Sequence, residues 1–189
     1  GERNAASDEK NEIEKLKSEN VEGIILDLRG NGGGSLQTVV DMTGFFIKDG
    51  PVVQVKSTGG KKEILRDTDP SISWDGPLVL MVNEFSASAS EIVSGVMQDY
   101  DRGGILGRPT YGKGLVQATR PLTYKAQLKV TTAKYYIPSG RCIQALDYSN
   151  KKDGKAQRTE DSARVAFKTQ NGRLVYDGKG LNPDIEIKS

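Results

Sequence analysis

Residues 77–99 read PLVLMVNEFSASASEIVSGVMQD, and this stretch organises the predicted core. Residues 77–82 form a short apolar run, which is typical of a strand covered on both faces. Ser88 and Glu91 fit a capping box, with the serine at the N-cap and the glutamate three residues later. Apolar residues then recur at helical spacing. The stretch predicts a buried strand, a turn, and a helix over residues 88–99.

Strand, turn and helix occur in the same order earlier in the chain. Residues 21–28 are a second apolar run, residues 29–35 (RGNGGGS) are too rich in glycine for regular structure, and residues 36–46 favour a helix. A charged surface helix is expected over residues 7–20, capped by Ser7. Further strands are expected at residues 51–55, 62–65 and near 104–106, and a β-hairpin or meander over residues 115–136.

The last third of the chain favours β structure outside this core. Residues 147–157 are polar and rich in lysine and indicate an exposed excursion, while residues 165–168 and 174–176 fit short strands or helical pieces. Residues 180–187 predict a turn and a terminal strand. Strands that alternate with helices in the first two thirds indicate an α/β layered core. We expect one domain over residues 1–189, with additional β structure in its C-terminal third.

Composition argues against several classes of function. The net charge is only +2, with acids and bases interspersed, so nothing points to nucleic acid or to an anionic membrane surface. Cys142 is the single cysteine and the chain has no histidine, so neither an internal disulfide nor a transition-metal site is expected. No stretch approaches the roughly 18 consecutive apolar residues of a transmembrane helix. We therefore expect no cofactor, no metal and no transmembrane segment.

The serine at the predicted helix start has two interpretations. In the first, Ser88 only caps a core helix. In the second, Ser88 is a nucleophile, because a helix N-terminus offers free N–H groups and the positive end of a dipole to an oxyanion. The N–H of Ala89 and one from the glycine turn would then be the donors. Since the chain has no histidine, the proton of Ser88 must pass to another base, and an amine is the natural candidate.

Lys113 is the candidate base, between two glycines and 25 residues after Ser88. It must act as an uncharged amine, a form that burial away from carboxylates favours. A Gly-Lys-Gly sequence is also typical of a solvated turn. Gln117 lies four residues on, where its amide oxygen could orient the amine. Asp99 could complete the group instead or serve structure at the helix end, and it ranks below Gln117 because a carboxylate favours the ammonium form.

Four motifs follow one another along the chain: DLRGNGGG (27–34), FSASASEI (85–92), YGKGLVQ (111–117) and NPDI (182–185). Together they resemble the C-terminal processing peptidases, also called tail-specific proteases, and the similarity extends over most of residues 21–187. The resemblance implies a crotonase/Clp-protease-like core and a serine endopeptidase with a Ser–Lys dyad at Ser88 and Lys113. It also implies Gln117 as the third member in many relatives, or a residue equivalent to Asp99 in some.

The same resemblance implies the surroundings of this dyad. The oxyanion hole would be formed by the N–H groups of Ala89 and of a glycine in the turn, with Gly34 as the best match. Substrates would be proteins cut near nonpolar C-terminal tails, outside the cytoplasm and often in the bacterial periplasm. Family members usually carry a PDZ domain and helical segments that are not found in this sequence, so we expect a peptidase core truncated at its N-terminus. An oligomer is compatible with these features.

Two other classes of function remain open. A catalytically silent member of the same fold would bind a peptide or another ligand without cutting it. Nucleotide binding through the glycine turn fits less well, because Ser35 occupies the third fingerprint position and Asp49 precedes its strand instead of ending one. The sequence thus favours the peptidase over both alternatives.

Overall fold

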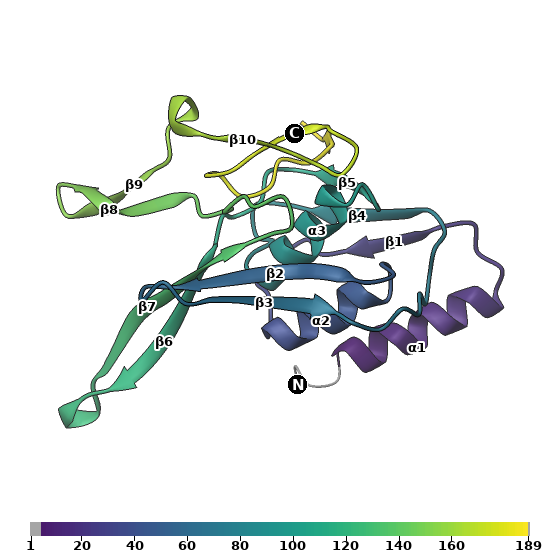
Figure 1. Cartoon of the computed structure of the whole chain (residues 1–189), viewed down its shortest axis with the longest axis horizontal. Coiled ribbons are helices and arrows are strands. Elements are labelled where there is room, and N and C mark those ends of the chain that lie inside the picture. Colours follow the sequence, from purple (N-terminus) through teal and green to yellow (C-terminus); the bar gives the residue numbers. More distant parts are fainter. Residues whose placement is uncertain (1–4, 189) are drawn as a thin grey trace.

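A parallel sheet of four strands forms one layer of the structure, which the computed structural model describes over residues 5–188 (Figure 1). All neighbours in this sheet run parallel, so their carboxyl ends meet at one edge. The glycine turn follows the first strand and the Ser88 turn follows its neighbour. The strands lie in the order β1 (Ile24–Asp27), β4 (Leu78–Val82), β5 (Gly104–Gly107) and β12 (Ile185–Glu186).

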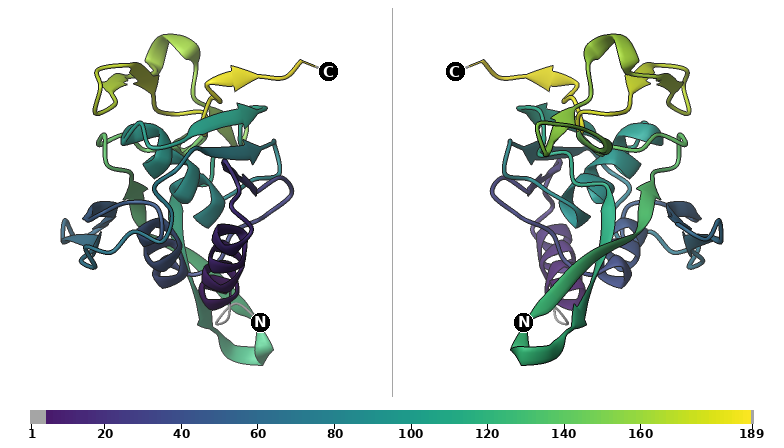
Figure 2. Two further views of the ribbon diagram at one scale, coloured as in Figure 1. Left: turned by 90° about the vertical axis from the view of Figure 1, so that its right-hand side faces the viewer. Right: turned by 90° about the vertical axis from the view of Figure 1, so that its left-hand side faces the viewer.

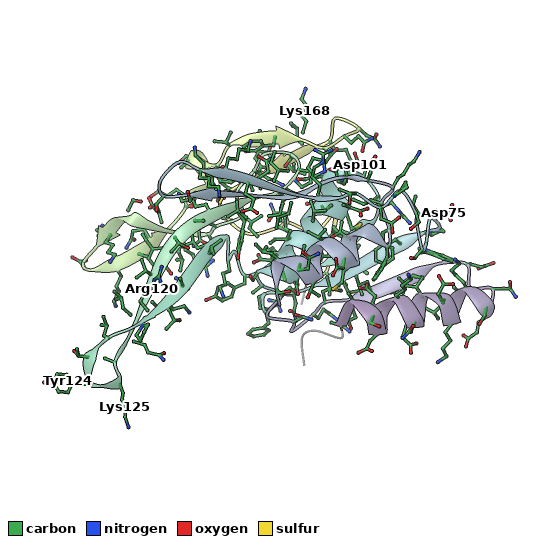
Figure 3. All side chains as sticks on the ribbon, turned by 60° about the horizontal axis from the view of Figure 1, so that its bottom comes forward. Asp75, Asp101, Arg120, Tyr124, Lys125 and Lys168 are labelled. Atoms are coloured by element: carbon green, nitrogen blue, oxygen red, sulfur yellow. The ribbon has the colours of Figure 1, made fainter. Side chains whose placement is uncertain are left out.

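A second, antiparallel sheet contributes the loop that carries Lys113. Its outer pair of strands, β6 and β7, extends from the body as a two-stranded ribbon (Figures 1 and 2). Tyr124 and Lys125 lie at the far end of this ribbon and Arg120 lies further back along it (Figure 3), and Tyr124 is fully exposed. The strand order is β3 (Lys62–Asp67), β2 (Gly50–Ser57), β7 (Gln127–Tyr136) and β6 (Leu115–Pro121), with the one-turn helix η2 (Thr123–Lys125) at the tip.

Helix α3 (Ala89–Asp99) is the centre of the core, and all of its residues are buried. It contacts β5 in the parallel sheet and β2 in the antiparallel sheet, so it joins the two layers. Helix α2 (Leu36–Gly44) packs against α3, and α1 (Ala5–Ser18) packs against α2. Within residues 5–188, none of the helices has the length and apolar character needed to cross a bilayer.

The C-terminal third adds two small hairpins, as expected. Residues 147–157, predicted as an excursion, form most of the exposed hairpin of β8 (Leu146–Lys152) and β9 (Lys155–Arg158). The two segments that fitted either strands or helical pieces are strands, β10 (Ala166–Lys168) and β11 (Leu174–Tyr176), paired antiparallel. A single helical turn, η3 (Asp161–Ala163), connects the hairpins. The predicted α/β core with extra β structure is therefore confirmed.

Two predicted boundaries are wrong. Helix α1 begins at Ala5, so Ser7 lies inside it instead of capping it. Strand β1 begins at Ile24 and not at residue 21, because its partner β4 starts only after Pro77. Proline has no N–H to donate, and only its carbonyl takes part, accepting from the Ile24 N–H. Pairing therefore starts opposite Leu78.

Glu9 on α1 is a destabilising feature of this fold. It shares a helix face with Ile13, and both of its carboxylate oxygens are buried without a hydrogen-bond partner in the described part of the chain. Burial raises the pKa of Glu9 from 4.5 to about 8. Below pH 4.5 the Glu9 carboxyl group is neutral in the folded chain and largely neutral in the unfolded chain, so its ionisation costs no stability. As the pH rises towards 8, the unfolded chain ionises while the folded chain stays neutral, so the free energy of unfolding falls.

We predict that Glu9→Gln raises the free energy of unfolding at pH 8.5 by roughly 2–4 kcal/mol, on the basis of about 1.4 kcal/mol per pKa unit. At pH 4.5 the gain should disappear. Urea unfolding at both pH values measures the difference. Glu14→Gln, on the exposed side of the same helix, is the matched control, and equal pH dependence of the two variants would contradict the prediction.

Candidate active site

The Ser88 backbone adopts a strained conformation at the start of α3. Its φ of 56° and ψ of −113° lie outside the regions that non-glycine residues usually occupy. Such strain costs on the order of 1–3 kcal/mol and persists only where surrounding contacts enforce it. A sharp turn between a strand and a helix presents a serine hydroxyl at the end of the sheet, and Ser88 is partly exposed there.

Hydrogen bonds to the segment that follows β1 hold the Ser88 turn in place. The buried Ser86 hydroxyl donates to the Leu28 carbonyl at 2.8 Å, and the Ala87 N–H donates to the Asn31 carbonyl at 3.0 Å. Gly33, with φ of 104°, lies so close that an added Cβ would be 2.9 Å from the Ser88 Cβ. The glycine turn and the Ser88 turn are therefore in contact, and this close approach requires glycine at position 33.

Two of the free N–H groups beside Ser88 are the predicted oxyanion donors. The Gly33 N–H is occupied, since it donates to the Asn31 side chain at 2.9 Å. Within residues 5–188, the N–H groups of Gly34 and Ala89 have no hydrogen-bond acceptor. Ala89 is the first residue of α3, where the helix dipole is positive. These two donors are therefore available to a ligand.

An apolar cavity of about 260 Å³ adjoins these donors. It lies between the glycine turn, α2 and α3. Because its wall is mostly aliphatic, it suits a small apolar group more than a charged one. Its lining residues include Gly34, Ala89, Leu28, Val39, Met42 and Val93.

The Lys113 loop is tied to the Ser88 turn through one carboxylate. Oε2 of Glu91 accepts from the Ser88 N–H and from the Lys113 N–H, both at 2.9 Å. The backbone nitrogens of the two predicted dyad members are thus two hydrogen bonds apart. The flanking glycines let the same loop pack closely against residues 144–145, because a Cβ at Gly112 would lie 2.4 Å from Ala145 and one at Gly114 would lie 2.9 Å from the Gln144 backbone.

The two candidates for a third member lie in very different places. Gln117 is exposed on β6, next to a bulge at Val116, and its side chain has no hydrogen-bond partner in the described residues. Its orienting role stays a prediction. Asp99 is at the opposite end of α3 from Ser88, a helix of 11 residues that is about 16 Å long at 1.5 Å per residue. The structure does not bring Asp99 together with Ser88.

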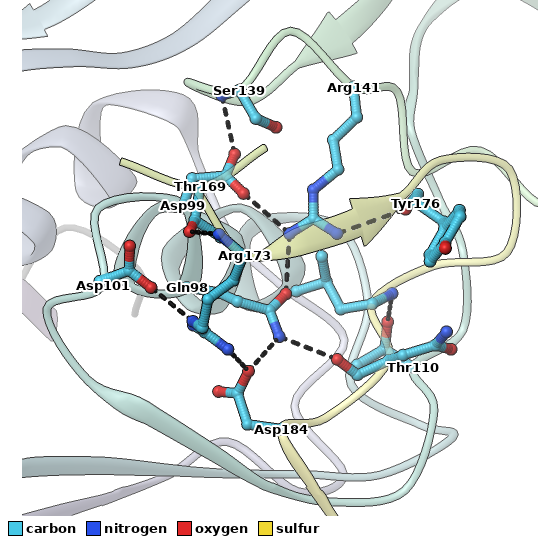
Figure 4. A network of polar contacts seen from close by, with 12 residues as sticks. Gln98, Asp99, Asp101, Thr110, Ser139, Arg141, Thr169, Arg173, Tyr176 and Asp184 are labelled. Carbon is cyan, nitrogen blue, oxygen red and sulfur yellow. Dashed lines mark hydrogen bonds and ion pairs between the residues drawn. The ribbon is translucent and has the colours of Figure 1, made fainter. Parts of the chain in front are cut away.

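Asp99 belongs to a buried polar network (Figure 4). Its carboxylate binds Arg141 at 2.9 Å and the Ser139 N–H at 2.9 Å, and the Asp99 and Arg141 side chains are 1% and 2% exposed. Burial lowers the pKa of Arg141, while the charge of Asp99 opposes this shift. Gln98 extends the network, since it also binds Arg141 and Asp184. Asp99 therefore has a structural role at the end of the helix, which was the alternative to completing the catalytic group.

Sequence reasoning gave Glu91 only a capping role and did not single out Thr110 or Arg141. The capping box at Ser88 and Glu91 is present. The partners of Glu91 in the 110–113 loop lie 19 to 22 positions away, so no local pattern signals them. Arg141 carries no signal either, because an arginine is expected at the surface.

We predict that Asp99→Asn lowers the free energy of unfolding by about 3 kcal/mol or more, because it leaves a buried guanidinium without its counter-charge. Urea unfolding measures the loss. The matched control is Asp27→Asn, which breaks the exposed pair with Arg29 at 2.7 Å and should cost less than about 1 kcal/mol. Similar small losses in both variants would show that the Asp99 pair does not stabilise the fold.

Curated relatives match most of this chain. The tail-specific protease of Haemophilus influenzae is 41% identical over 145 residues, which are 72% of this chain and 21% of that protein. The chloroplastic carboxyl-terminal-processing peptidase 2 of Arabidopsis thaliana is 39% identical over 138 residues, 72% of this chain and 27% of that protein. The chain therefore spans about a fifth to a quarter of the length of these two relatives.

A solved structure supports the same relationship at the level of the fold. The photosystem II D1 C-terminal processing protease superposes with a TM-score of 0.73 at 28% identity, covering 98% of this chain and 39% of that one. The model of Peptidase family S41 matches residues 2–149, which is most of the chain. These similarities, together with the strained serine turn and the adjoining lysine loop, show that the chain belongs to peptidase family S41.

Proposed function

We propose that this chain is the catalytic core of a serine endopeptidase with a Ser–Lys dyad. One observation carries the proposal: the backbones of Ser88 and Lys113 share the acceptor Glu91 Oε2, in a chain that has no histidine. The family to which the chain belongs supports peptidase chemistry, and the relatives are named as tail-specific or C-terminal processing proteases. The dyad itself and the choice of substrate are our proposal.

In the proposed reaction, Lys113 as an uncharged amine removes the Ser88 proton while Oγ attacks the scissile carbonyl. The N–H groups of Ala89 and Gly34 stabilise the resulting oxyanion. The intermediate collapses to an acyl-enzyme as the leaving amine takes the proton from Lys113. Water, deprotonated by the same amine, then releases the acid product and restores Ser88. Gln117 orients Lys113 in this scheme.

The preference for nonpolar tails is supported by the apolar cavity beside Gly34 and Ala89. A substrate residue whose carbonyl oxygen meets these two N–H groups would direct its side chain into this cavity. Its aliphatic walls, which include Val39, Met42 and Val93, favour small apolar side chains.

An extended substrate is supported by the second sheet. β6 is the last strand of this sheet, so its outer edge is unpaired within the described residues, and it begins two residues after Lys113. Extended peptides bind such edges by adding a strand. We propose that a protein tail pairs with β6 on its way to Ser88. An extracytoplasmic location, as in a periplasm, is part of the same proposal.

We predict that Ser88→Ala and Lys113→Ala each reduce cleavage of a peptide with a nonpolar C-terminus by on the order of 10⁴-fold or more. Ser88→Ala should also abolish labelling by a fluorophosphonate. Ser94→Ala and Lys168→Ala are matched controls, because the former lies within α3 and the latter on β10. Labelling that persists in Ser88→Ala refutes the nucleophile, and unchanged turnover in Lys113→Ala favours a different base.

We predict that Met42→Ala widens the apolar cavity and shifts specificity towards larger side chains. The ratio of kcat/KM for leucine over alanine at the scissile position should rise roughly 10-fold or more, because one to three methylene groups change transition-state binding by this amount. Steady-state kinetics on paired peptides measure the ratio. Gln37→Ala, exposed on α2, is the control, and an unchanged ratio in Met42→Ala excludes this cavity as the specificity pocket.

A further inference from the structure

Glu91 is the most completely enclosed acidic side chain of the site. It lies in the first turn of α3, and its exposed fraction is 0%. A buried carboxylate is costly unless hydrogen bonds replace its lost water. Here four donors surround it: the Thr110 hydroxyl and the Gly112 N–H on Oε1, and the Ser88 N–H and the Lys113 N–H on Oε2.

These four hydrogen bonds favour the ionised carboxylate. Three of the donors are main-chain N–H groups, which can only donate, and together with the Thr110 hydroxyl they supply two hydrogen bonds to each carboxylate oxygen. Burial raises the pKa of Glu91, and its hydrogen bonds with Thr110, Lys113, Gly112 and Ser88 oppose that shift.

The donors come from two loops that meet beside the start of the helix, where the Tyr111 N–H also donates to the Ser86 carbonyl at 3.1 Å. Ser88 belongs to the turn after β4, and residues 110–113 belong to the loop between β5 and β6. Thr110 adds a third segment, because its hydroxyl accepts from the Leu181 N–H at 2.8 Å while it donates to Glu91. Gly180 closes the arrangement: a Cβ there would lie 3.1 Å from Glu91 Oε1 and 2.6 Å from the Thr110 hydroxyl.

A capping role explains only one of these contacts. A capping glutamate needs a single hydrogen bond, to the N-cap N–H, which here is that of Ser88. The other three contacts join the helix start to the lysine loop. Alongside the hydrogen bond from Tyr111 to Ser86, the carboxylate thus connects two backbones that the chain separates by 25 residues.

We propose that Glu91 is a positioning residue for the Ser–Lys reaction, whose buried carboxylate sets the spacing of the Ser88 turn and the Lys113 loop. This inference rests on the proposed function. Glu91 does not touch the substrate; it acts through the two backbones that carry the reacting side chains. An error of about 1 Å in such spacing reduces rates by on the order of 100-fold.

The test uses two nearly isosteric variants of the folded chain. Glu91→Gln keeps the shape but turns one acceptor oxygen into a donor, so two of the four N–H and O–H donors lose their acceptor. Thr110→Val removes one donor from Oε1 and leaves the Oε2 pair intact. Thr110→Ser keeps the hydroxyl. Val96→Ala, buried in the middle of α3, is the control for loss of stability without change at the site.

The rate of fluorophosphonate labelling of Ser88, measured against reagent concentration, separates binding from reaction. Glu91→Gln should lower the maximal labelling rate by roughly 10- to 100-fold with little change in the half-saturating concentration. Thr110→Val should show a smaller loss, and Thr110→Ser and Val96→Ala should label at the wild-type rate once corrected for the folded fraction. Wild-type labelling in folded Glu91→Gln, or an equal loss in Val96→Ala, overturns the inference.

A second measurement keeps this inference separate from the proposed function. If the wild-type chain is not labelled at Ser88, the proposed function fails on its own. Hydrogen exchange then tests the carboxylate directly: the amides of Ser88 and Lys113 should exchange slowly in the wild type and at least about 10-fold faster in Glu91→Gln. Equal exchange in both proteins overturns the role of Glu91 whatever the labelling shows.

Discussion

The buried carboxylate of Glu91 is the interaction on which the arrangement of the site depends. It is a charge in the protein interior, stabilised by three main-chain N–H groups and one hydroxyl. Those N–H groups belong to turns, where no regular secondary structure supplies an acceptor. The carboxylate and the loops therefore satisfy each other's hydrogen-bonding groups, and a main-chain hydrogen bond from Tyr111 to Ser86 adds to this link. The local sequence places Glu91 in the first turn of the helix, while the tertiary fold brings the hydrogen-bond donors of the lysine loop to it.

The two ends of α3 perform different tasks. At its N-terminus, Glu91 connects the helix to the segments that carry Ser88 and Lys113. At its C-terminus, Gln98 and Asp99 bind Arg141, which anchors the 139–141 turn and part of the C-terminal segment. Because α3 is buried along its whole length, the polar side chains near both of its ends need protein partners. The helix thus positions the site from one end and stabilises the molecule from the other.

Hydrophobic pattern and turn chemistry predicted most of the core. The strand, turn and helix of residues 77–99 were predictable because the apolar run, the capping box and the helical spacing agree with one another. The start of β1 was not predictable from these patterns, since it depends on Pro77, after which the partner strand β4 begins. The start of α1 was not either, because the serine at position 7 mimics a cap inside a longer helix.

The site was predictable where adjacency follows from sheet topology. Gly33 lies against Ser88 because β1 pairs in parallel with β4, and the turns after both strands share one edge. The second role of Glu91 and the place of Arg141 depend on loops far along the chain, which pattern alone does not locate. Asp99 is the clearest example. Its distance from Ser88 follows from the length of the helix, but no sequence pattern indicates that Arg141 is its partner.

The backbone angle of Ser88 has a consequence for how this protein can change. At φ of 56° and ψ of −113°, a glycine would relax strain that any residue with a Cβ must bear. Loss of the hydroxyl through glycine is therefore favoured by folding stability even as it removes the reactive oxygen. At this position, selection for folding stability and selection for the reactive hydroxyl therefore favour different residues.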